Sequence, residues 1–260
     1  MLRGMVETLT WLSPFPAHTG VVAIPWGVLI PAAAIPHVGL LPHVWLVLAA
    51  AIAGAAAGRF GRGLLRRLPH GVLVAPGACE LGVAVLWSAV AVRVVDGLPL
   101  WWSIVPLVLG WLAVLLTACD VLHRRLPDAL TLPVYPFVAL IVVVASLWAN
   151  DPTLLLRALG GAVVFAGVYS LVRLLRPSAM GAGDVKLAGG LGAAVGAVSV
   201  FATMLCVLAA AVLTLITAGC TRARTVAHGP AMLAPAWFAT TWVSTGLPGL
   251  LAGTPVPGPT

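Results

Sequence analysis

The sequence predicts an all-α fold, a polytopic bundle of transmembrane helices. Hydrophobic residues make up 61% of the 260 residues and charged residues only 8%, and the mean hydropathy is +1.10, which is too apolar for a soluble domain of this length. Several stretches reach the roughly 20 apolar residues that a helix needs to cross about 30 Å of hydrocarbon. Their Ala, Leu, Val and Gly content favours helices over the alternating pattern of a membrane barrel. About seven or eight spans are therefore expected.

The expected spans follow one another along most of the chain. Five have clear limits, at residues 40–58, 79–95, 101–119, 129–149 and 154–175. The stretch 185–219 is too long for one span, so we divide it near the glycine-containing segment 196–200, and residues 232–251 form the last span. Residues 21–35 contain prolines and could form one more span, or a re-entrant or interfacial segment. The chain then divides into an N-terminal apolar segment (1–37), a transmembrane bundle (38–252) and a disordered tail (253–260).

Basic residues are gathered in alternate connections between these spans. The connections at 96–100 and 150–153 instead carry acidic residues and neither Lys nor Arg. Since loops on the cytoplasmic side are enriched in Lys and Arg, the clusters predict which helix ends face the cytoplasm, with Arg93 and Arg157 as exceptions. The net charge of +7 thus marks topology and does not indicate nucleic-acid binding. The clusters are Arg59, Arg62, Arg66 and Arg67; His123 to Arg125; Arg173, Arg176 and Lys186; and Arg222 with Arg224.

No metal or cofactor site is expected. The four cysteines are isolated and form no CxxC pair, so neither a zinc site nor a disulfide framework is indicated, and we expect small buried apolar residues. The histidines are dispersed along the chain without a metal-like pair. The cysteines are Cys79, Cys119, Cys206 and Cys220.

Two further residue classes have structural interpretations. The small-residue pairs Gly54/Gly58 and Gly192/Gly196 are spaced to pack helices together. Tryptophans near the predicted span ends are expected at the membrane interface, as for Trp101, Trp102 and Trp148.

Carboxylates are scarce in this chain, and two of them stand at the ends of apolar runs. Asp120 ends one run and Asp184 begins another, so the predicted topology places both at cytoplasmic helix ends. Ionisable groups at a membrane boundary mark functional sites or pair with one another. Two carboxyls in contact keep one proton between them, which supplies a general base for water and a general acid for a scissile carbonyl. Alternatively, each aspartate could cap a helix or pair with a neighbouring arginine.

Each aspartate lies in a distinctive local sequence. Asp184 belongs to Gly181-Ala182-Gly183-Asp184-Val185-Lys186-Leu187, whose two glycines let the backbone turn sharply and let a substrate strand approach. Asp120 heads a short basic segment that Pro127 closes before the next helix, with Asp128 expected as the N-cap of that helix.

The pairing of Asp-x6-Pro-Asp-x-Leu-Thr at 120–131 with Gly-x-Gly-Asp-x-Lys-Leu at 181–187 resembles the type IV prepilin peptidases, a family of GxGD-type aspartyl proteases. An Arg-Leu-Pro at 67–69 and a Gly-Pro at 229–230 agree with the same family. The resemblance implies cleavage of a short basic leader from prepilin-like precursors at the cytoplasmic face of the inner membrane, with no metal or other cofactor.

The same resemblance implies roles for individual residues. Asp120 and Asp184 would be the catalytic pair. Gly181 and Gly183 would shape the active-site loop, while Lys186 would position substrate or tune Asp184. The expected partners are prepilin-like substrates and the lipid membrane, with no nucleic acid.

The chain departs from the family in one respect. Many bacterial members carry two CxxC pairs in the loop between the first spans, and some also methylate the new pilin N-terminus. Both pairs are missing here, so a zinc-binding insert is not expected and methylation stays open.

Two other functions fit parts of the sequence. A non-enzymatic transporter or assembly subunit could use Asp120 and Asp184 as proton or cation sites, although both acids lie at helix ends rather than in mid-span. A presenilin-like protease would have Tyr before its first catalytic aspartate, where this chain has Cys119.

Overall fold

The computed structural model describes residues 21–23, 29–31, 40–68, 72–123, 126–177, 180–221 and 228–242. Nearly all of them are helical, which confirms the all-α prediction. The elements are β1 (Val21–Ala23), β2 (Leu29–Pro31), α1 (Leu40–Arg67), α2 (Ala78–Val95), α3 (Leu100–His123), α4 (Asp128–Thr131), α5 (Val134–Ala149), α6 (Thr153–Leu175), α7 (Ala182–Val198), α8 (Val200–Thr221) and α9 (Gly229–Trp242).

The chain forms two compact units, Met1–Leu46 and Val47–Thr260. In the first unit, β1 and β2 pair in antiparallel fashion with Val22 opposite Ile30. Most of the predicted segment 1–37 and all of the predicted tail 253–260 lie outside the described residues, so the proposed division of the chain stays a prediction.

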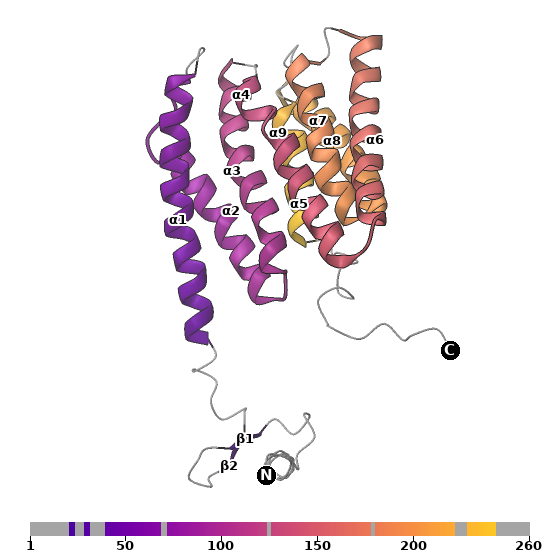
Figure 1. The fold of residues 1–260 in the computed structure, drawn as a ribbon. Coiled ribbons are helices and arrows are strands. Elements are labelled where there is room, and N and C mark those ends of the chain that lie inside the picture. The colour runs from indigo at the N-terminus through magenta and orange to yellow at the C-terminus, as the bar shows by residue number, and fades with distance from the viewer. Residues whose placement is uncertain are drawn as a thin grey trace, which may run out of the picture. The chain divides into compact units, whose positions relative to one another are not determined.

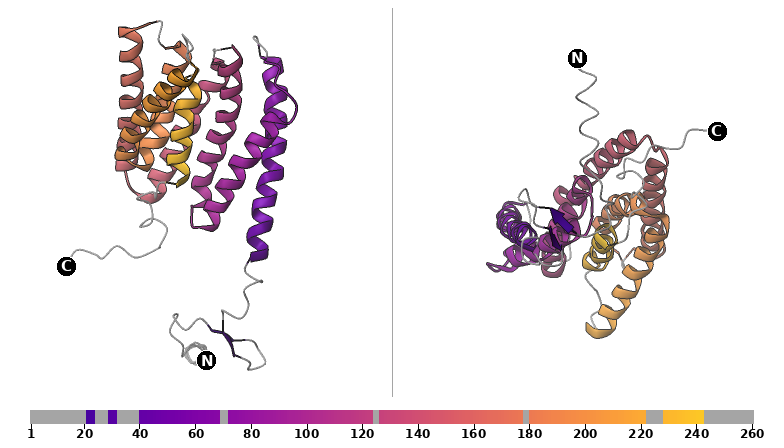
Figure 2. Two further views of the ribbon diagram at one scale, coloured as in Figure 1. Left: turned by 180° about the vertical axis from the view of Figure 1, so that it is seen from behind. Right: turned by 90° about the horizontal axis from the view of Figure 1, so that it is seen from below.

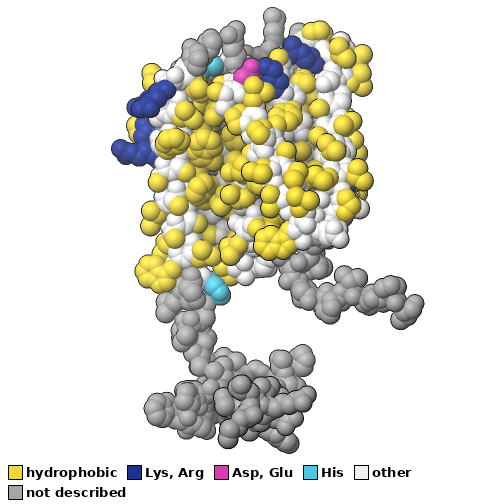
Figure 3. Space-filling view, viewed as in Figure 1, with side chains coloured by type: hydrophobic (Ala, Val, Ile, Leu, Met, Phe, Trp, Pro, Cys, Tyr) yellow, Lys and Arg dark blue, Asp and Glu magenta, His cyan; other side chains and the backbone are white. Residues whose placement is uncertain are grey.

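Six helices in the described part of the chain are long and apolar enough to cross a membrane. They are His43–Arg67, Ala78–Val95, Leu100–His123, Asp128–Trp148, Thr153–Leu175 and Val200–Cys220. Large apolar side chains cover their outer surface, among them Trp148 at 86% exposure and Leu174 at 78%. On the face shown in Figure 3, hydrophobic side chains cover the flank of the bundle, and charged side chains gather towards one end. The chain is a multi-pass membrane protein.

Helix α7 occupies the interior of the bundle. It packs against α5, α6, α8 and α9, and most of its residues are buried. With only 17 residues it is shorter than the six spans, and its glycines and alanines allow neighbours to approach on several sides. Seen from below in Figure 2, α9 lies between α3 and α8, against both of which it packs.

Apart from the short α4, consecutive helices of the bundle run in opposite directions (Figure 1). The C-terminal ends of α3 and α6 therefore meet the N-terminal ends of α7 and α9 at the top of that view. Asp120 lies on this side in the last turn of α3, and Asp184 lies on the same side in the first turn of α7. We call it the aspartate end, and the other the opposite end.

Helix α1 is longer than predicted. The expected span stops at residue 58, but the helix continues to Arg67, because the sequence contains no proline between residue 58 and Pro69. Its arginines therefore extend from helical turns rather than from a loop. Arg62 forms an ion pair of 2.7 Å with Glu80, which ties α1 to the first turn of α2.

The helices pack closely at the small-residue pairs Gly54/Gly58 and Gly192/Gly196, as the sequence predicted. A Cβ atom at Gly54 would lie 2.9 Å from Cα of Ala84 in α2. A Cβ atom at Gly196 would lie 2.9 Å from Cα of Gly161 in α6, and Gly192 faces the carbonyl of the same glycine. Backbones therefore touch at both interfaces.

The interfacial interpretation of the tryptophans is wrong for Trp102. This side chain is fully buried, and its Nε1–H donates to the carbonyl of Thr240 at 3.0 Å. Thr240 lies in the last turn of α9, whose carbonyls have no partner within the helix. A buried indole satisfies such a group while filling the core. Trp148, by contrast, is exposed.

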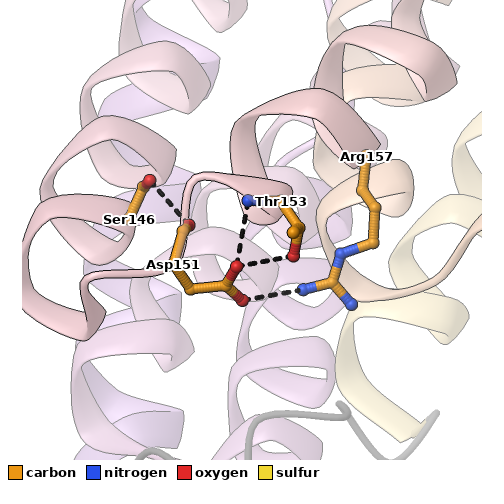
Figure 4. A network of polar contacts seen from close by, with 4 residues as sticks. All are labelled: Ser146, Asp151, Thr153 and Arg157. Carbon is orange, nitrogen blue, oxygen red and sulfur yellow. Dashed lines mark hydrogen bonds and ion pairs between the residues drawn. The ribbon is translucent and has the colours of Figure 1, made fainter.

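Both arginines that depart from the predicted charge pattern have an acidic partner at the opposite end. Arg93 contacts Asp96 at 3.2 Å. Arg157 lies 3.7 Å from Asp151, whose carboxylate also accepts hydrogen bonds from the backbone N–H and the hydroxyl of Thr153 (Figure 4). The hydrogen bonds from Thr153 lower the pKa of Asp151, so it remains ionised beside Arg157.

Candidate active site

Asp120 lies within α3, one turn before its end at His123, and not at the head of a loop as the sequence suggested. Its side chain is 6% exposed. Oδ2 accepts the backbone N–H of Gly229, the first residue of α9, at 2.7 Å. A Cβ atom at position 229 would lie 2.9 Å from the same oxygen. A residue with a side chain therefore cannot occupy this position without displacing the carboxylate.

Asp184 occupies the third position of α7, after Gly181 as the N-cap. One of its oxygens does cap the helix, because Oδ2 accepts the N–H of Gly181 at 3.2 Å. The other oxygen is different. Oδ1 is buried and has no hydrogen-bond partner among the described residues. A buried acceptor without a hydrogen-bond partner costs free energy, so a functional explanation such as catalysis is needed for it. Capping therefore accounts for only half of this carboxyl.

The two aspartates influence one another electrostatically. Asp184 is 7% exposed and precedes the interior part of α7, outside the six spans. Burial, together with the nearby charge of Asp120, raises the pKa of Asp184 to about 6, against the opposing effect of the Gly181 N–H. The pKa of Asp184 is thus closer to neutrality than that of an ordinary aspartate, as expected for a buried carboxyl beside a second one.

The predicted loop glycines lie where close approach is needed. A Cβ atom at Gly183 would lie 2.8 Å from Cβ of Leu126, in the segment that follows Asp120. At Gly181 it would lie 3.2 Å from Oδ2 of Asp184. The first turn of α7 therefore packs directly against the segment that follows α3.

Lys186 contacts Asp128. Its Nζ lies 2.7 Å from Oδ2 of Asp128, and both side chains are about half exposed. Asp128 is the first residue of α4 and Pro127 is the N-cap, so the expected capping role of Asp128 is wrong. Tyr135 adds a second link to the same part of α7, because its hydroxyl donates to the carbonyl of Lys186.

Sequence reasoning overlooked two residues beside the aspartates. Tyr169 of α6 is buried, and its ring centroid lies 5.3 Å from that of His228. His228 immediately precedes Gly229, the residue that holds Asp120. The scarcity of tyrosine in the sequence could have drawn attention to Tyr169. The chain has only two tyrosines, and both Tyr135 and Tyr169 lie close to this site.

Within the described ranges, no group of three or more His, Cys, Asp or Glu side chains could hold a metal ion. The chemical groups that the site presents are two buried carboxyls. Asp120 accepts a backbone hydrogen bond, and Asp184 has a raised pKa and an oxygen without a hydrogen-bond partner among the described residues. Such a pair can act as base and acid at one centre.

Comparisons with known proteins indicate a family. Residues 107–219 match the type IV leader peptidase family, and the match includes Asp120 and Asp184. The chain is also similar to a prepilin leader peptidase/N-methyltransferase of Aeromonas hydrophila, with 28% identity over 192 residues, or 70% of this chain. The similarity spans 60% of the length of that relative. No solved structure matches the chain significantly.

Proposed function

We propose that the chain is a membrane aspartyl endopeptidase that cleaves the leader from prepilin-like precursors, because residues 107–219 match the type IV leader peptidase family. Asp120 and Asp184 are the catalytic pair in this proposal. The observation that carries it is the burial of two carboxyls from α3 and α7 at one end of the bundle, one of them with a free oxygen and a raised pKa.

The environments of the two carboxyls suggest their roles. Asp120 is the general base, and the N–H of Gly229 that it accepts holds its carboxylate in place. Asp184 is the acid, because its pKa is raised to about 6. Asp120 takes a proton from water as the water oxygen bonds to the scissile carbonyl carbon. Asp184 gives its proton to the carbonyl oxygen.

Breakdown of the resulting tetrahedral intermediate completes the reaction. The C–N bond breaks, the leaving nitrogen takes the proton that Asp120 acquired, and one hydroxyl of the intermediate returns its proton to Asp184. The products are the free leader carboxyl and the new N-terminus of the pilin, and both aspartates regain their starting protonation states. No metal or nucleotide takes part in this scheme.

We further propose that the aspartate end faces the cytoplasm across the inner membrane. Arg66 and Arg67 end α1 there, and Arg173 lies in the last turn of α6. At the opposite end, Arg93 and Arg157 are each paired with an aspartate. This asymmetry is the one that orients membrane proteins. The substrate, which carries its own membrane helix, would approach from within the bilayer and present an extended leader junction to residues 181–184.

Co-expression with candidate prepilins tests the proposal. Asp120→Asn and Asp184→Asn should each abolish leader removal while the protein still accumulates in the membrane. Asp96→Asn is the matched control, because it makes the same change at the opposite end and should leave cleavage intact. Normal cleavage by either catalytic variant would refute the pair. Proton-coupled transport by reconstituted protein without cleavage would instead support the transporter alternative.

A further inference from the structure

His228 connects Asp120 to a helix that carries neither aspartate. The next residue, Gly229, donates its N–H to Oδ2 of Asp120 at 2.7 Å. The imidazole Nδ1 of His228 lies 2.7 Å from Oγ1 of Thr214 in α8. The position of the Gly229 N–H therefore depends on a residue that α8 holds in place.

The direction of the Thr214 hydrogen bonds determines the tautomer of His228. Thr214 Oγ1 also lies 2.7 Å from the carbonyl oxygen of Ala210, which can only accept. A hydroxyl has one proton, so Thr214 donates it to Ala210 and accepts from His228. Nδ1 of His228 thus carries a hydrogen, and Nε2 carries none in the neutral ring. Burial lowers the pKa of His228 and favours this neutral form.

A second helix also contacts the imidazole. The His228 ring lies 5.3 Å from Tyr169 of α6 at an angle of 49°, and Tyr169 stacks on Phe165 at 5.3 Å. Both aromatic residues are buried. The hydrogen bond to α8 and the ring contact to α6 restrict the movement of the imidazole. They therefore also restrict the backbone of the next residue, Gly229.

We propose that His228 is a positioning residue for the catalytic base. Its Nδ1–H bond to Thr214 fixes the Gly229 N–H against Asp120, which keeps that carboxylate directed into the site. The inference rests on the proposed function of Asp120 and extends it to α8, which would carry no catalytic group itself.

Side chains that imitate one ring nitrogen at a time provide the test. Asn places an N–H near the position of Nδ1, whereas Gln reaches the position of Nε2. With purified protein and a candidate prepilin, His228→Asn should keep kcat within about threefold of the wild-type value, since one imperfect hydrogen bond is at stake. His228→Gln should lower kcat by about 10-fold to 100-fold, as expected when a catalytic group is misplaced, with little change in KM.

Changes on the other side of the bond leave His228 intact. Thr214→Val should act like His228→Gln, and Thr214→Ser should act like the wild type. The matched control is Thr203→Val, because Thr203 is a buried residue of the same helix whose hydroxyl also donates four residues back, to Ser199. It lies 11 residues from Thr214, or about 16 Å along the helix, and should leave kcat unchanged.

The pH profile separates positioning from a general loss of structure. In His228→Gln and Thr214→Val, the shape of the kcat profile should differ from that of the wild type, because Asp120 loses the hydrogen bond from the Gly229 N–H, whereas a general loss of structure would lower kcat equally at every pH. Equal kcat and equal pH profiles for His228→Asn and His228→Gln would overturn the inference even if Asp120→Asn is inactive. Full activity of Asp120→Asn would overturn the proposed function itself.

Discussion

Lys186 binds Asp128 at 2.7 Å across 58 positions of the sequence. This ion pair joins the first turns of α7 to α4, and so links the segment after Asp120 to the helix that carries Asp184. Leu126 against Gly183 and Tyr135 against the carbonyl of Lys186 make contacts between the same two segments. The two catalytic candidates are thus held together through their flanking chain.

The ion pair should therefore affect cleavage without being part of the chemistry. Lys186→Met and Asp128→Asn should each lower kcat about threefold to tenfold, as expected for a small displacement of the loop. The exchange Lys186→Asp with Asp128→Lys should recover most of that loss in a cleavage assay. Loss of all activity in the exchanged protein would show that Lys186 itself contacts the substrate.

Gly229 should tolerate no side chain. In Gly229→Ala, the new Cβ would lie 2.9 Å from Oδ2 of Asp120, so the carboxylate or α9 must shift. We expect cleavage to fall by about 100-fold. Gly219→Ala is the matched control, because nothing lies within 4 Å of a Cβ at that position of α8. A Gly229→Ala protein with wild-type activity would contradict the geometry of the site.

Two adjacent glycines of α6 should respond in opposite ways. A Cβ atom at Gly161 would meet Gly196 at 2.7 Å, whereas one at Gly160 meets nothing within 4 Å. Gly161→Ala should lower the midpoint of thermal unfolding in detergent, because α6 and α7 must separate. Gly160→Ala should raise stability by about 0.5–1 kcal/mol through the helix preference of alanine. Equal shifts in the two proteins would contradict the interface.

Burial of Asp184 predicts a pH dependence of stability. Because its pKa is raised to about 6, the folded protein binds more protons at this group than the unfolded chain does between about pH 4 and pH 6. The free energy of unfolding should therefore decrease as pH rises through this window, by up to about 3 kcal/mol. Asp184→Asn should remove this dependence and be more stable than the wild type at pH 7. Thermal unfolding of both proteins between pH 4 and pH 8 measures the difference.

The parts of the fold that depend on local sequence were predictable. Apolar length locates the spans, and the alternation of basic clusters brings Asp120 and Asp184 to one end. The details that depend on contacts between distant residues were not. Asp128 has the sequence context of an N-cap, but Lys186 binds it from 58 positions away. His228 has no distinctive neighbours in sequence other than Gly229, and its importance emerges only when α6 and α8 surround it. The buried free oxygen of Asp184 likewise results from packing.

The contact of Gly161 with Gly192 and Gly196 also has a mechanical consequence. No side chain separates α6 from α7 there, so an incoming membrane helix has no gap to enter, and parting the two helices would expose their backbones. Helices α6 and α7 should therefore move as one rigid body, so that Tyr169 and Asp184 keep their relative positions. Any opening that admits a substrate has to occur where side chains, which can rotate away, separate α7 from its other neighbours.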